Sequence, residues 1–232
     1  MIRHIPFASL YFADHGWLKS RFHFSFAEYR NPDNIHYGPL RVMNDDIIEA
    51  GKGFGTHPHE NMEIISYVLR GALTHKDSMG NKESLGRGGV QYMSAGTGVM
   101  HSETNEGGEA VHLIQTWIIP AEKGLEPQYG SKVFDKNARH NRWLHLAGPE
   151  ESEAAIHIYQ DANMYVSEID AGQRLPFALQ KGRRLYLKVM EGSGTINGTV
   201  FAPGDAAEVE GESVVVEAIT DLHLLLVEMR TE

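Results

Sequence analysis

Short apolar runs separated by glycine-containing turns are the feature that most limits how this chain can fold. The runs Met62–Leu69, Val111–Ile119 and Leu222–Met229 have strand length and are rich in β-branched and large apolar residues. Turn sequences such as Arg87-Gly88-Gly89 and Asn197-Gly198 stand between such runs. Glycine accounts for 24 of 232 residues, which is above the usual level of about 7%. Few segments have a helical apolar period, so we predict an all-β protein.

A polar, irregular segment divides the strand-rich sequence into two parts. Pro120–Gly148 is rich in Lys, Arg, Asn, His and Gly, and a second strand-rich part begins near Ala154 and continues to the end. We predict two β-sandwich or barrel units, residues 1–135 and 150–232, joined by an irregular connector at 136–149. Leu69-Arg-Gly71 and Met190-Glu-Gly192 close comparable β runs in the two parts, which fits a repeat of one barrel plan.

Composition excludes several classes of protein. The chain has no Cys, so disulfides, thiol nucleophiles, iron–sulfur clusters and cysteine zinc sites are ruled out. No apolar stretch approaches the roughly 18 residues of a membrane helix, and the first 16 residues lack a secretory pattern, so we expect a cytoplasmic protein without a membrane partner. The net charge of −10 argues against direct nucleic-acid binding, because a binding surface for phosphates is basic.

Two short motifs carry pairs of metal-ligand side chains. Residues i and i+2 of a strand point to the same face, so His57 and His59 emerge together, as do His101 and Glu103. Two neighbouring strands with such pairs would bring four donors into one barrel interior. Three imidazoles and a carboxylate suit Fe, Mn, Ni, Co or Cu, with Zn as a further option. Four ligands leave open positions on a metal that prefers five or six, which is typical of a catalytic site.

The carboxylate position has a second candidate. Glu63 lies four residues after His59, an even spacing that also turns its side chain inward if the strand is regular. From the spacing alone, Glu63 and Glu103 compete for the same role. Apart from His112, the remaining histidines are scattered singly and we interpret them as structural: His4, His15, His23, His36, His75, His140, His145, His157 and His223.

These motifs resemble those of the cupins and, more specifically, of the pirin family. The first cupin motif is matched by Gly51, His57, His59 and Glu63, with Gly71 one residue late. The second is matched by Gly98, His101 and Asn105, with Gly96-Thr97-Gly98 in place of Pro-x-Gly. Those departures are themselves pirin-like, as are His57-Pro-His59, His101-Ser-Glu103 and the segment from His112 to Pro120. The first half of the chain matches densely, and the second half only in its general plan.

The resemblance implies a bicupin, two jelly-roll β-barrels packed face to face, with metal only in the N-terminal barrel. It assigns the carboxylate ligand to the glutamate of H-x-E, which is Glu103, and places Glu63 beside a ligand histidine, where it would hold the tautomer. In the second barrel, Arg174-Leu-Pro-Phe177 stands where a metal-binding cupin would have H-x-H, and no His lies near Gly204–Val209. We therefore expect residues 150–232 to form a cupin domain without a metal site.

Bacterial proteins of this type resemble quercetin 2,3-dioxygenases. The resemblance implies a metal-dependent enzyme that cleaves a small planar phenolic substrate, a flavonol, with O₂ and releases CO. Glu103 would be both ligand and catalytic base, with Glu63 as the alternative base. The expected cofactor is one divalent transition metal, Fe(II) first, with Mn, Co, Ni, Cu or Zn as alternatives. Since two barrels are self-contained, we expect a monomer.

Two other functions stay open at the level of sequence. Pirin-family proteins also act as interaction proteins, so the chain could be a metal-dependent, redox-responsive partner of a transcription regulator or a metabolic enzyme. A different cupin reaction is the third option, although no Arg/Lys cluster for a sugar phosphate lies beside either motif. His112 and Gln115 should point to opposite faces of their strand, so only one of them can face the barrel interior. Aromatic residues near the motifs are expected mostly to fill the core: Phe54, Tyr67, Tyr92 and Trp117.

Overall fold

A computed structural model of the chain describes residues 1–231, which form two compact units. The N-terminal unit comprises Tyr11–Phe134 and Ile158–Gln160. The C-terminal unit comprises Met1–Leu10, Asp135–His157 and the described residues from Asp161 onward. The described residues contain no α-helix, and their helical turns are the short 3₁₀ segments η1 (Phe7–Ser9) and η2 (Lys136–Ala138). The predicted all-β class is confirmed.

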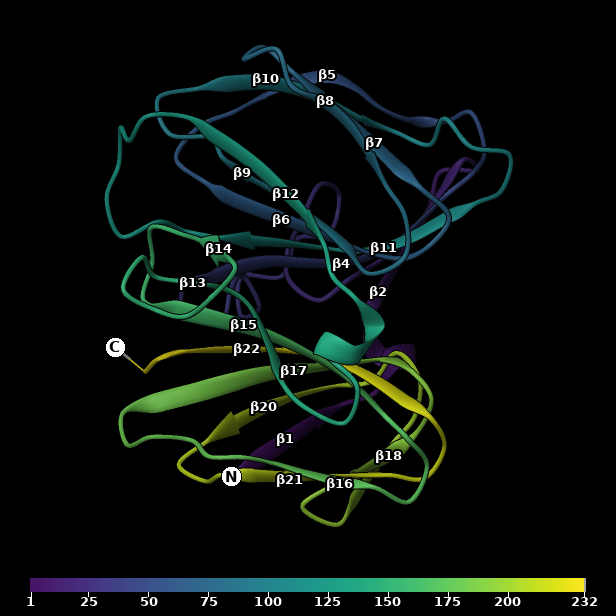
Figure 1. Cartoon of the computed structure of the whole chain (residues 1–232), viewed down its shortest axis with the longest axis vertical. Helices are drawn as coiled ribbons and strands as arrows, with labels where there is room; N and C mark the ends of the chain where they lie inside the picture. The colour runs from purple at the N-terminus through teal and green to yellow at the C-terminus, as the bar shows by residue number, and fades with distance from the viewer. Residues whose placement is uncertain (232) are drawn as a thin grey trace. The chain divides into compact units, whose positions relative to one another are not determined.

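The N-terminal unit is built from two antiparallel sheets that enclose one interior (Figure 1). The larger sheet has the order β12 (Gln128–Val133), β9 (Gly89–Ser94), β6 (Glu63–Arg70), β11 (Val111–Ile118), β4 (Leu40–Ile48), β3 (Leu18–Phe22) and β2 (Tyr11–Asp14). The smaller has the order β5 (Gly53–His59), β10 (Val99–Thr104), β7 (Leu73–Asp77) and β8 (Lys82–Leu85). Ile48 and Val68 of the larger sheet pack with Leu73 and Leu85 of the smaller one, so apolar burial holds the two layers together.

The C-terminal unit repeats this two-sheet plan. Its larger sheet has the order β1 (Ile2–Ile5), β20 (Ala206–Glu210), β17 (Arg183–Glu191), β22 (Leu222–Arg230), β15 (Ala162–Ile169), β13 (Leu144–Gly148) and β14 (Ile156–His157). The smaller has the order β16 (Arg174–Phe177), β21 (Val214–Ala218), β18 (Gly194–Ile196) and β19 (Thr199–Phe201). A continuous apolar core joins them, with Leu187 and Leu224 on one side and Phe201 and Val216 on the other.

The compact units are less contiguous in sequence than the predicted division at 1–135, 136–149 and 150–232. Strand β1 pairs with β20, so the first ten residues belong to the C-terminal unit. The segment Ile158–Gln160 belongs to the N-terminal unit, where the Ala121 amide donates to the Tyr159 carbonyl. The segment expected to be an irregular connector contains η2 and strand β13, which pairs with β15.

None of the residues in 1–231 belongs to a helix with the length and apolarity needed to cross a bilayer.

Candidate metal centre

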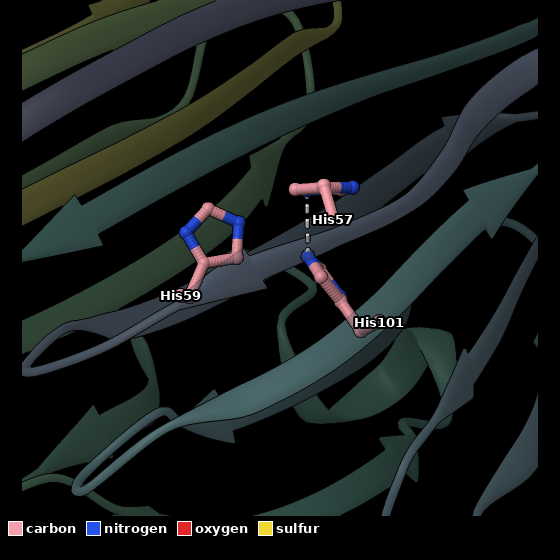
Figure 2. Close-up of side chains that lie close together, drawn as sticks. All are labelled: His57, His59 and His101. Atoms are coloured by element: carbon pink, nitrogen blue, oxygen red, sulfur yellow. Dashed lines mark hydrogen bonds between the residues drawn. The ribbon is translucent and has the colours of Figure 1, made fainter.

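Three histidines converge on adjacent strands β5 and β10 of the smaller N-terminal sheet. In the antiparallel pairing, His57 lies opposite His101, and His59 lies opposite Val99. The Nε2 atoms of His57 and His101 are 3.0 Å apart, and one ring nitrogen of each of the three histidines lies within 4.8 Å of the others. Figure 2 shows the three rings turned toward one another above the two strands. The predicted clustering of these imidazoles is therefore present in the fold.

A glycine lets β5 approach β10 closely beside this cluster. The register shifts between His101 and Glu103, which lie opposite His57 and Phe54, so β5 carries one extra residue there. A Cβ on Gly53 would lie 2.3 Å from the Glu103 carbonyl oxygen. Because no side chain fits at that distance, glycine is required where the bulge closes. The bulge sets the positions of the histidines on β5 relative to the ligand-type residues on β10.

Burial disfavours the charged form of two of the three histidines, His59 and His101. His101 is 1% exposed, and burial together with His57, His59 and His75 lowers its pKa to about 3. Burial and the neighbouring His57 lower the pKa of His59 to about 4. The His57 Nδ1–H donates to the Gly55 carbonyl at 2.7 Å, so Nε2 is the nitrogen of that ring that faces His101. Imidazole nitrogens that face one another fit a bound metal ion.

Glu103 is fully buried beside the histidines and is surrounded by donors. Its Oε1 accepts hydrogen bonds from the Ser66 hydroxyl at 3.1 Å and from the Gln91 amide, and its Oε2 accepts one from Gln115 Nε2 at 2.6 Å. Burial raises the pKa of the Glu103 carboxyl, while His75 and the hydrogen bonds oppose that rise. Glu103 forms a second possible ligand group with His75 and His101. The carboxylate is thus held in place by three other strands.

Glu63 lies apart from the histidines, because no single regular strand runs from His59 to Glu63 as the prediction from even spacing requires. Strand β5 ends at His59, the chain turns through Asn61 at a φ of 48°, and Glu63 begins β6. Its carboxylate accepts hydrogen bonds at 2.7 Å from the Tyr92 and Ser94 hydroxyls and at 3.2 Å from the Tyr159 amide. Ser66, three positions along the same strand, faces Glu103 instead. Because the turn interrupts the alternation of side chains along the strand, an even spacing from His59 does not place the Glu63 side chain on the same face.

A cavity of about 390 Å³ opens beside the histidine cluster. His57, His59, Glu103 and Gln115 line it, together with an aromatic wall made of Trp17, Phe22, Phe26, Phe54 and Trp117. Of the four aromatic residues singled out in the sequence, Phe54 and Trp117 line the cavity, while Tyr67 and Tyr92 are buried elsewhere in the core. Gln115 faces the interior, and His112 points away from it and bonds Asp45 at 2.6 Å.

Two polar residues of β4 line the same cavity. Asn44 and Asp46 are both 2% exposed and lie two positions apart, hence on one face of the strand. The Asn44 Oδ1 is buried without a hydrogen-bond partner. Burial, with a smaller contribution from Asp45 and Glu103, raises the pKa of Asp46 to about 7, although the Ser20 hydroxyl donates to it. The cavity therefore combines an apolar wall with a few fixed polar groups, as small-molecule sites do.

Sequence reasoning missed His75 and the three donors to Glu103. On sequence alone His75 is one of the scattered histidines, yet it is 1% exposed and contacts His101. One available signal was the spacing His75-Lys-Asp77, which repeats the i, i+2 pattern of the other two motifs. Ser66 and Gln91 stand in ordinary strand sequences, and no local pattern marks them. Strand alternation marks Gln115 only as one of two residues that could face the interior.

Comparison with known proteins gives concordant results for both units. The Pirin family model matches residues 7–118, and the model described as a quercetinase C-terminal cupin domain matches residues 145–229. A pirin-like protein of Caulobacter vibrioides is 43% identical over 230 residues, covering 98% of this chain and 99% of the relative. Quercetin 2,3-dioxygenase of Escherichia coli K12 is 41% identical over 219 residues, covering 94% of each chain.

Solved structures agree with these sequence matches. The crystal structure of the bacterial pirin YhhW from Escherichia coli in complex with nickel(II) has a TM-score of 0.94 and 37% identity, and the match covers all of both chains. The matches to the two cupin domains and the matches to full-length relatives therefore indicate the same family. The chain belongs to the pirin family of cupin proteins.

Proposed function

We propose that the N-terminal unit binds one divalent transition metal ion through His57, His59, His101 and Glu103. The support is the convergence of three imidazoles, with the Nε2 atoms of His57 and His101 only 3.0 Å apart. A related pirin of 37% identity has been solved with nickel(II). Three nitrogens and one oxygen suit Fe(II), our first choice, and also Mn, Co, Ni, Cu or Zn.

We further propose that the protein is a dioxygenase that cleaves flavonols such as quercetin and releases CO. The single observation that carries this proposal is the position of the aromatic cavity, which opens on His57, His59 and Glu103. A planar phenolic ring can pack on the aromatic wall formed by Trp17, Phe22, Phe26, Phe54 and Trp117. The Escherichia coli relative that carries the name quercetin 2,3-dioxygenase is 41% identical over almost its whole length.

The residues of the cavity have distinct tasks in this reaction. A bound metal ion supplies Lewis acidity, which makes a coordinated hydroxyl group more acidic. The Glu103 carboxylate lines the cavity and accepts the proton of the flavonol 3-hydroxyl, while Gln115 and Ser66 keep its oxygens in place. Overall, the substrate takes up both atoms of O₂ and loses one carbon as CO, so one O₂ is consumed for each CO released.

Glu63 is given no part in this proton transfer, because it is absent from the lining of the cavity. Its carboxylate accepts hydrogen bonds from the Tyr92 and Ser94 hydroxyls and the Tyr159 amide, none of which lines the cavity. Glu103→Gln and Glu63→Gln therefore make a matched pair of variants, because each replaces a buried carboxylate with an amide of the same shape.

The test is O₂ uptake and CO release on quercetin by metal-stripped protein reloaded separately with Fe(II), Mn(II), Co(II), Ni(II), Cu(II) or Zn(II). We expect Glu103→Gln to retain part of its metal and to lose at least about 100-fold in turnover, the usual contribution of a general base. Glu63→Gln should keep its turnover once folding has been verified. Tight metal binding without CO release from any loaded form would refute the dioxygenase and favour the interaction-protein alternative.

A further inference from the structure

A second buried histidine stands behind the proposed metal ligand His101. His75 and Asp77 lie on β7, the strand that pairs with β10 on the side opposite to β5. The His75 Nδ1 is 3.5 Å from the Nδ1 of His101, whereas the His101 Nε2 faces the Nε2 of His57. His101 therefore uses one ring nitrogen toward the proposed metal ligands and the other toward His75.

Asp77 fixes the far end of this row of side chains. Its Oδ2 lies 3.0 Å from the His75 Nε2, and both side chains are almost completely buried. Its Oδ1 accepts from the backbone amides of Met79 at 2.9 Å and Asn81 at 3.0 Å. The pKa of Asp77 is lowered, since hydrogen bonds from His75 and Asn81 outweigh the effect of burial. An ionised carboxylate can only accept, so the His75 Nε2 must carry a proton.

We propose that Asp77 and His75 are positioning residues that favour the metal-binding tautomer of His101, an inference that rests on the metal site proposed above. With one proton on each ring, a proton on the His75 Nε2 leaves its Nδ1 as an acceptor. His101 can then donate to this acceptor from Nδ1 while its Nε2 binds a metal ion. The ring of His75 is held in its plane by stacking on Tyr129, with centroids 4.3 Å apart and planes 16° apart.

A competing arrangement exists in the metal-free protein. The His101 Nε2 could instead donate to the Nε2 of His57 at 3.0 Å, and His75 could still keep its proton on the Asp77 side. A cation bound by the Nε2 atoms of His57 and His101 would exclude this arrangement, because it takes both lone pairs. The His101 proton then lies on Nδ1, where it needs the acceptor that Asp77 maintains on the His75 Nδ1.

Replacing Asp77 with Asn should reverse every hydrogen bond in this row. The two backbone amides from Met79 and Asn81 hold the oxygen of the new side chain at the Oδ1 position. Its NH₂ group therefore faces the His75 Nε2, which becomes an acceptor. His75 then donates from Nδ1, and His101 is left with its proton on Nε2, where it blocks metal binding.

The experiment measures both the His75 tautomer and the metal affinity. Long-range ¹H–¹⁵N correlation spectra of the metal-free protein at pH 8 locate the His75 proton, with signals assigned by their loss in His75→Gln. Calorimetric titration with Ni(II) gives the affinity. We expect a His75 Nε2–H in the unmodified protein, a His75 Nδ1–H in Asp77→Asn, and a 10- to 100-fold weaker affinity for Ni(II) in that variant.

The matched control is Asp205→Asn in the C-terminal unit, where Asp205 bonds His4 at 2.9 Å and also accepts from backbone amides. It should change neither readout. A proton on the His75 Nδ1 in the unmodified protein, or an Asp77→Asn affinity within twofold of the original, would overturn the inference. If Asp77→Asn does not fold, His75→Phe keeps the stacked ring shape but removes the acceptor, and an affinity within twofold of the original in that variant would overturn it equally. Failure of the unmodified protein to bind Ni(II) would count against the metal site itself, and the spectra would still decide whether Asp77 orients His75.

Discussion

Replacing Asp46 with Asn should stabilise the N-terminal unit, and more strongly at high pH than at low pH. Asp46 is 2% exposed, and burial raises its pKa from 3.8 to about 7. Because the folded state holds this proton more tightly than the unfolded chain, the stability of the folded protein falls as pH rises from about 4 to about 7 and then levels off. An Asn side chain has no charge to bury, and it can still accept the hydrogen bond from Ser20.

The magnitude follows from the two pKa values. One pKa unit corresponds to about 1.36 kcal/mol, so ionising Asp46 in the folded state costs up to about 4 kcal/mol. About 3 kcal/mol of that cost develops between pH 5 and pH 8. The gain in unfolding free energy from Asp46→Asn should therefore be about 3 kcal/mol larger at pH 8 than at pH 5.

Urea unfolding of the metal-free protein followed by tryptophan fluorescence measures this difference. The chain has three Trp residues, and a Trp143→Phe background leaves Trp17 and Trp117, which both belong to the N-terminal unit. This choice matters because a chain of two units need not unfold in one step. Comparing the variant with its parent at each pH cancels the titration of the histidines. An Asp46→Asn effect of equal size at pH 5 and pH 8 would show that Asp46 is not held protonated by burial.

Two further predictions concern the geometry of the proposed metal site. Gly53→Ala should weaken the Ni(II) affinity measured by calorimetry at least about tenfold, because the new Cβ would lie 2.3 Å from the Glu103 carbonyl oxygen. Gly55→Ala should leave the affinity unchanged, because a Cβ there would have no atom within 4 Å. Gln115→Leu should lower the Ni(II) affinity about 10- to 100-fold, because it removes the donor to the Glu103 Oε2. His112→Gln, on the opposite face of β11, should not lower it, and equal affinities in the two variants would contradict the role given to Gln115.

Local patterns predicted the strands well. The runs Met62–Leu69, Val111–Ile119 and Leu222–Met229 correspond to β6, β11 and β22 within one residue at each end. Asn197-Gly198 joins β18 to β19, with φ values of 47° and 81° that only such residues adopt readily. These features depend on the sequence within a few residues of each position, so they can be read without the fold.

Long-range pairing explains where the sequence-based division of the chain differed from the compact units. Strand β1 joins β20 some two hundred residues later, and its own sequence contains nothing that names this partner. Strand β13 lies in a polar stretch and is recognised as a strand through its pairing with β15 and β14. Burial and hydrogen bonding to distant neighbours determine whether such segments form strands, because the β propensity of the segments themselves is weak.

The sequence by itself determined that the chain is all-β, and it singled out His57, His59 and His101 as residues that share an interior face. It could do so because side-chain alternation within a strand is a local property with a period of two. Only the tertiary structure decided that Glu63 turns away after the bend at Asn61 and that distant strands supply Ser66, Gln91 and Gln115 to Glu103. It likewise placed His75 behind His101. The physical reason is that a metal-type site is assembled across strands, and the register between strands is set by the packing of the whole barrel rather than by any one segment.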